Sequence, residues 1–153
     1  AAMAPTGALM CFVALFCGAV WGRPTWGTYW VWDARLTSEL ILLFLYLGFL
    51  ALQSSIADHR RADKACAVIA LVGVVNVPII YFSVRWWNTL HQGASITSSG
   101  SSIHPVMLAT ILIMVAAAWI YSLGSTFART RTIILERERR EEWAQEAALR
   151  GDI

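Results

Sequence analysis

Four long stretches of the chain are almost entirely apolar, and shorter polar segments separate them. A helix needs roughly 20 apolar residues to cross roughly 30 Å of hydrocarbon. Stretches of that length occupy residues 1–21, 36–56, 65–84 and 105–128. They lack the alternation of apolar and polar residues that strands would show, and lipid tolerates only helices or closed barrels. The pattern predicts an all-α integral membrane protein with four transmembrane helices in this chain.

The basic residues of the polar segments predict the orientation. Segments 22–35 and 85–104 together hold three Lys and Arg residues, whereas segments 57–64 and 129–153 hold nine. Because cytoplasmic loops are enriched in Lys and Arg, we expect the second pair of segments, and both ends of this chain, to be cytoplasmic. The first pair then faces the periplasm of a bacterium. We therefore expect a transmembrane domain over 1–128, followed by a cytoplasmic tail.

The tail, residues 129–153, is predicted to be helical. Opposite charges recur four residues apart, in Glu136 with Arg140 and in Arg137 with Glu141, and such pairs stabilise helices. A solvated helix and a docking face for a cytoplasmic partner are both compatible with this composition.

Composition narrows the class of protein further. The 153 residues are 58% hydrophobic and 14% charged, with a mean hydropathy of +0.57. A soluble domain is nearer half apolar and a quarter charged, which excludes an ordinary soluble enzyme domain and a disordered chain. The net charge is only +2 and the basic residues are scattered, which excludes a nucleic-acid partner. The sequence has no Walker A loop, so an ATPase would be a separate chain.

Tryptophan is unusually frequent and lies mainly on one side. Six of the eight tryptophans fall at or beyond the outer ends of the predicted spans, namely Trp21, Trp26, Trp30, Trp32, Trp86 and Trp87. One interpretation of the dense run from Trp26 to Asp33 is an aromatic belt at the headgroup level. The other is a ligand platform. In a helix Trp26 and Trp30 share one face, with Asp33 three residues further on, and Gly27 would let a planar ligand approach closely.

Two charged residues follow this run. Arg35 and Glu39 are four residues apart, and the spacing favours an ion pair at the membrane edge. The alternative is that Arg35 contacts an anionic group, such as a carboxylate on the ligand.

One of the three histidines is a candidate ligand. His91 follows Trp86-Trp87-Asn88-Thr89-Leu90 on the predicted outer side. A lone histidine is usually not a ligand, but imidazole suits the axial position of a haem iron. His59 lies among the charges of the cytoplasmic loop, where we expect it to be solvated. His104 precedes Pro105 at a predicted helix start, which indicates a cap or interface residue.

The apolar stretches also contain a few residues with packing roles. Asn76 can hydrogen-bond to a neighbouring helix, and Pro78 frees a carbonyl and bends its helix. The cysteines, Cys11, Cys17 and Cys66, all lie in apolar runs and are expected to pack as small apolar side chains.

Two segments resemble a known family. Residues 26–48 (WGTYWVWDARLTSELILLFLYLG) resemble the tryptophan-rich "WWD" signature of haem-handling membrane proteins. Together with residues 76–93 (NVPIIYFSVRWWNTLHQG), they look like the haem exporter protein C (CcmC) family of bacterial cytochrome c maturation. The resemblance runs from the first residues to about residue 140.

The resemblance implies a function in the bacterial inner membrane. Members of the family hold haem b non-covalently on the periplasmic face and present it to the haem chaperone CcmE. They work with the ABC transporter subunits CcmA and CcmB and the small membrane protein CcmD. In this chain the resemblance implies that His91 is an axial ligand and that the haem platform comprises Trp26, Gly27, Trp30, Trp32 and Asp33. It implies a carrier subunit among membrane lipid rather than an enzyme.

The chain departs from the family in one respect. The family has six spans and a first axial histidine between the first two, whereas this chain shows four spans and begins where the third would. We therefore expect about two spans and that histidine to be absent, since His59 is on the wrong side and His104 matches no family motif. The alternative function is a subunit of a haem lyase, which attaches haem to apocytochrome c. Those relatives share the tryptophan-rich signature but are much larger.

Overall fold

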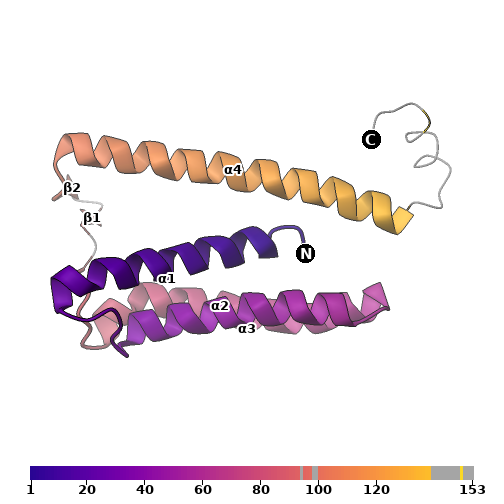
Figure 1. Ribbon diagram of the computed structural model, residues 1–153, viewed down its shortest axis with the longest axis horizontal. Helices are drawn as coiled ribbons and strands as arrows, with labels where there is room; N and C mark the ends of the chain where they lie inside the picture. The colour runs from indigo at the N-terminus through magenta and orange to yellow at the C-terminus, as the bar shows by residue number, and fades with distance from the viewer. Residues whose placement is uncertain (94, 98–99, 139–148, 150–153) are drawn as a thin grey trace. The chain divides into compact units, whose positions relative to one another are not determined.

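The computed structural model describes residues 1–93, 95–97, 100–138 and 149 of the chain, which is mostly helical (Figure 1). The helices within these residues are α1 (Ala4–Trp26), α2 (Ala34–Ser55), α3 (His59–Trp86) and α4 (Pro105–Glu138). Each is long and apolar enough to cross a membrane, which confirms the all-α class and the four predicted spans. A small antiparallel hairpin of β1 (Ile96–Thr97) and β2 (Gly100–Ser101) precedes α4.

Local signals in the sequence set the helix boundaries. Asp33 and Asp58 cap α2 and α3, because a carboxylate oxygen of each accepts backbone N–H groups of the first helical turn. Helix α1 ends at Gly27, whose φ of 79° is the left-handed conformation that favours glycine. The first helix therefore extends to Trp26, beyond the predicted limit at residue 21.

The last helix is longer than the predicted span. Helix α4 continues past residue 128 to Glu138, so the first part of the predicted tail is helical. The predicted charge pairs involve Arg140 and Glu141, which lie outside the described residues. The residues from Thr110 onward form a unit of their own, and none of the described side chains of α4 is buried.

Helix α2 is the middle helix of the first unit and contacts both α1 and α3 (Figure 1). Its contact with α1 includes a buried cluster of Cys11, Leu15 and Leu36. The helices approach closely at Gly7, because a Cβ atom there would lie 2.5 Å from Cζ of Tyr46. This contact holds the N-terminal part of α1 against α2.

The contact between α2 and α3 contains a polar anchor. The buried Asn76 side chain donates from Nδ2 to the Ser38 carbonyl oxygen at 2.9 Å. This confirms the predicted hydrogen bond from Asn76 to a neighbouring helix. It also fixes α3 against the first turns of α2, which carry several of the candidate site residues.

The cysteines are free thiols, and two of the three pack as predicted. Cys11 and Cys66 are buried, whereas Cys17 is exposed on α1. The prediction that Cys17 packs against other parts of this chain is therefore wrong, because its side chain is exposed. Many large apolar side chains, such as Phe44, Val68 and Val74, are likewise exposed, as suits helices surrounded by lipid.

Candidate functional site

The candidate residues meet at one end of the first unit. Short connections make α1, α2 and α3 antiparallel to their neighbours. The end of α1, the start of α2 and the end of α3 therefore lie together, and segments 27–33 and 87–93 leave the helices there. The fold thus brings together the two segments that the charge pattern assigns to the same side.

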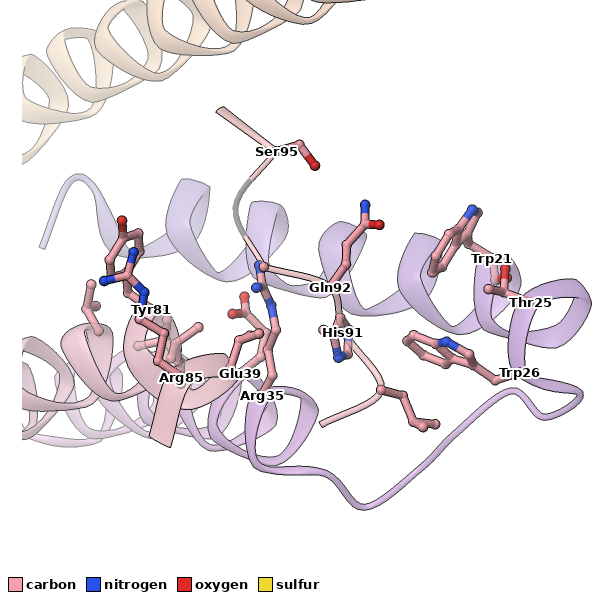
Figure 2. Close-up of a pocket in the computed structure, with 16 residues that line it drawn as sticks. Trp21, Thr25, Trp26, Arg35, Glu39, Tyr81, Arg85, His91, Gln92 and Ser95 are labelled. Carbon is pink, nitrogen blue, oxygen red and sulfur yellow. The ribbon is translucent and has the colours of Figure 1, made fainter. Parts of the chain in front are cut away.

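A cavity of about 860 Å³ lies between these elements (Figure 2). Its wall includes aromatic and titratable side chains, namely Trp21, Trp26, Arg35, Glu39, Arg85 and His91. Leu42, Val77, Ile80 and Val84 add aliphatic surface. Sites for small molecules and cofactors usually enclose roughly 300–1,000 Å³, so the cavity is large enough for a sizeable ligand. Its lining suits a ligand that is mainly apolar and carries negative charge.

His91 is held in this wall by contacts on several sides. Its Nδ1 lies 2.8 Å from Oδ2 of Asp33, and the two side chains are only 20% and 5% exposed. Its ring packs edge-on against Trp26, with 4.8 Å between the ring centroids (Figure 2). Its backbone N–H donates to Oγ1 of Thr89 at 3.3 Å. Among the described residues Nε2 has no hydrogen-bond partner, so this nitrogen is available to a ligand.

The predicted helical face of Trp26, Trp30 and Asp33 is wrong. Helix α1 ends at Trp26, and residues 27–33 are not helical, because Gly27 turns the chain with its positive φ. A Cβ atom at Gly27 would have no heavy atom within 4 Å. The positive φ by itself favours glycine at this position, and the approach of a ligand ring to Gly27 stays a prediction.

The tryptophans of the signature consequently have different surroundings. Trp26 lines the cavity, together with Trp21, whose ring centroid lies 5.4 Å away. Trp30 instead packs on the core cluster between α1 and α2, and its Nε1 is buried without a hydrogen-bond partner among the described residues. Trp32 contacts Trp30 edge-on but is 76% exposed. Neither Trp30 nor Trp32 belongs to the described cavity wall.

The charged residues at the start of α2 do not pair as predicted. Arg35 and Glu39 both line the cavity (Figure 2), but the ion pairs among the described residues do not include them. Glu39 Oε1 instead accepts a hydrogen bond from the Cys11 thiol at 3.3 Å. The Arg35 guanidinium is therefore available to an anionic ligand.

Most residues of the wall were not among the sequence candidates for the site, and two of them, Trp21 and Arg85, bear on ligand binding. Trp21 lies before the tryptophan-rich run, within α1, and Arg85 lies in the last turn of α3. The signal that could have marked Arg85 is its predicted side of the membrane. Because Lys and Arg are depleted on the outer side, an arginine predicted to lie at the outer end of α3 is a candidate for binding an anion. The cavity thus has two guanidinium groups, from Arg35 and Arg85.

The other histidines lie outside the cavity. His59 is exposed at the first position of α3, the opposite end of that helix from Trp86. His104 precedes α4, and its carbonyl accepts the N–H of Leu108 at 3.0 Å. The expectations of a solvated His59 and of a capping position for His104 are confirmed.

Comparison with known proteins gives consistent matches. A family profile described as "CcmC: Heme exporter protein C" matches residues 1–145. Heme exporter protein C of Escherichia coli (strain K12) is 49% identical over 150 residues, which are 98% of this chain and 60% of that protein. The Haemophilus influenzae protein of the same name is 48% identical over 148 residues, 96% of this chain and 60% of the relative. The Bradyrhizobium diazoefficiens protein of the same name is 51% identical over 137 residues, which are 89% of this chain and 52% of that relative. The chain thus spans little more than half the length of these relatives.

Proposed function

This chain belongs to the Heme exporter protein C family, and on that basis we propose that it handles haem during cytochrome c maturation. In this proposal the chain is a multi-pass carrier subunit of the bacterial inner membrane rather than an enzyme. Its cavity faces the periplasm and both ends of this chain are cytoplasmic. It holds haem b non-covalently and delivers it to the haem chaperone CcmE. The ABC transporter subunits CcmA and CcmB and the small protein CcmD act with it.

The observation that carries the proposal is the convergence of His91, Trp26 and Arg35 on one cavity. Haem is a flat, apolar macrocycle with an iron at its centre and two carboxylates at one edge. An imidazole is the common protein ligand of that iron, tryptophan rings offer apolar faces to the macrocycle, and guanidinium groups suit carboxylates. The residues present therefore fit haem as the cargo of this site.

Each signature residue has a role in this proposal. His91 supplies one axial ligand, while Trp26 and Trp21 form the apolar wall. Arg35, joined by Arg85, binds the haem carboxylates. Gly27 and Asp33 form the turn and the helix start that place this wall, and Trp30 packs their segment on the core. The exposed Trp32 is available to contact the chaperone.

Substitution of His91 tests the proposal. We expect His91→Ala to insert into the membrane normally but to lose the Soret spectrum of a histidine-ligated haem in the purified protein. His59→Ala is the matched control, because this exposed histidine lies at the other end of α3. Added imidazole should restore the spectrum to His91→Gly. An unchanged spectrum in His91→Ala would show that this histidine does not bind iron.

The destination of the haem tests the second half of the proposal. Co-expression with CcmE should give haem-loaded chaperone, and Trp32→Ala should reduce this loading. Co-expression with apocytochrome c alone should give no haem attachment. Haem on apocytochrome c but not on the chaperone would indicate a haem lyase subunit instead.

A further inference from the structure

We infer that Asp33 is a positioning residue that fixes the tautomer of His91, so that the Nε2 lone pair is available to iron. This inference rests on the proposed function, since it concerns how the same histidine is made competent to bind haem. This role differs from the one predicted for Asp33 from the sequence, which was to form part of the haem platform.

The geometry leaves the Asp33 carboxylate little freedom. Its two oxygens have separate partners: Oδ1 accepts the backbone N–H of Leu36 at 2.7 Å, and Oδ2 lies 2.8 Å from Nδ1 of His91. The first contact fixes the carboxylate to the start of α2, and the side chain is 5% exposed. Because Asp33 and His91 are 58 positions apart, this contact also links the turn before α2 to the segment after α3.

The chemistry of the contact determines where the imidazole proton resides. An ionised carboxylate can only accept hydrogen bonds, and Oδ1 of Asp33 already accepts the N–H of Leu36. Nδ1 of His91 must therefore be the donor. A neutral imidazole carries one proton, so Nε2 keeps its lone pair, which iron requires. The edge-on contact with Trp26 further restrains rotation of the ring. A carboxylate behind a ligating histidine also makes the imidazole a stronger donor to the metal.

Asparagine at position 33 is the most informative substitution, because it cannot satisfy both contacts of aspartate. If its amide oxygen accepts the N–H of Leu36, its NH₂ group faces His91 and donates to Nδ1. The imidazole proton then moves to Nε2, which can no longer bind iron. If the amide is reversed, two N–H groups face each other at the helix start and the cap is lost. Serine at position 33 preserves a good cap but does not reach His91.

The experiment compares purified wild-type protein with Asp33→Asn, Asp33→Ser and His91→Ala. Haem titration, the absorption and EPR spectra, and the midpoint potential of the bound haem are measured for each. We expect Asp33→Asn to weaken haem binding by roughly tenfold to a hundredfold, the usual range when the partner of a metal-bound histidine is lost, and to resemble His91→Ala spectroscopically. We expect Asp33→Ser to retain histidine ligation with a more positive potential. Asp58→Asn is the matched control, because the Asp58 carboxylate likewise caps a helix but, among the described residues, pairs with the Arg61 side chain rather than with an imidazole.

A double variant tests whether Asp33 acts through His91. If it does, Asp33→Asn adds no further loss of haem affinity to His91→Ala, because coupled residues are not additive. Full additivity would overturn the inference. A wild-type spectrum and potential in Asp33→Asn, with ligation lost in His91→Ala, would also overturn it while leaving the proposed function intact. An unchanged spectrum in His91→Ala would instead refute the proposed function.

Circular dichroism of each variant separates folding from ligation. If Asp33→Asn loses helicity, Asp33→Ser decides the question. A potential equal to that of the wild type in Asp33→Ser would overturn the inference, and a positive shift would support it.

Discussion

Replacing Gly27 by alanine should destabilise the protein through the backbone alone. A Cβ atom at Gly27 or at Gly18 would meet no heavy atom within 4 Å, so neither methyl group creates a clash. The two glycines differ in conformation: Gly27 has a φ of 79°, whereas Gly18 lies within α1. Gly18→Ala is therefore a matched control that adds the same atoms to the regular part of the same helix.

The expected effects have opposite signs. A side chain in the left-handed conformation costs roughly 1–2 kcal/mol, so Gly27→Ala should lower the free energy of unfolding by that amount. Alanine in the interior of a helix is favoured over glycine by roughly 0.5–1 kcal/mol, so Gly18→Ala should raise it. The two variants should differ by about 1.5–3 kcal/mol. Asparagine tolerates the left-handed conformation, so Gly27→Asn should lose less than Gly27→Ala.

The free energies are measured by denaturant titration in detergent micelles, followed by far-ultraviolet circular dichroism. Equal changes in Gly27→Ala and Gly18→Ala would refute the assignment of a backbone role. Haem titration of Gly27→Asn adds a second comparison. If the glycine serves the turn, this variant binds haem like the wild type. A loss of haem binding at normal stability would show that Gly27 faces the ligand after all.

Further predictions concern the arginines and tryptophans. Arg35→Gln and Arg85→Gln should each weaken binding of haem by up to about fivefold, because exposed ion pairs contribute at most about 1 kcal/mol, but should not weaken binding of haem dimethyl ester in titrations of the purified protein. Arg23→Gln is the control, since Arg23 stacks over a tyrosine ring rather than lining the cavity. If the three arginine variants weakened the binding of haem and of its dimethyl ester equally, recognition of the haem carboxylates would be contradicted. Trp26→Leu should weaken haem binding itself, whereas Trp32→Leu should leave haem titration unchanged and lower only chaperone loading; the opposite pattern would reverse the roles given to the two rings.

The fold was predictable because long apolar stretches leave few alternatives. A run of 20 apolar residues needs its backbone hydrogen bonds satisfied internally in lipid, so the number and type of the helices followed directly. The boundaries were less secure because they depend on single residues. Gly27 moved the end of the first helix to Trp26, and α4 continued to Glu138.

Sequence reasoning predicted the site correctly only where the type and position of a single residue were enough to make it a candidate. His91 was a candidate by residue type and side of the membrane, and it does lie in the cavity wall. The helical face through Trp26 and Trp30 failed, because spacing arguments assume a continuous helix and Gly27 interrupts it. The contact between Asp33 and His91 could not be predicted, since it joins positions 58 apart that meet only once three helices have packed.

If the cavity binds haem as proposed, the antiparallel order of α1, α2 and α3 has a consequence for when the site is completed during synthesis. A chain is synthesised from its N-terminal end, so Trp21, Trp26 and Asp33 are in place when only the first helices have been inserted. The imidazole arrives last, because His91 follows α3 along the chain. An intermediate that lacks α3 therefore has the tryptophans of α1 but neither the aliphatic surface of α3 nor the imidazole. In the proposed function, ligation by His91 would begin only after the third helix of this chain has been inserted.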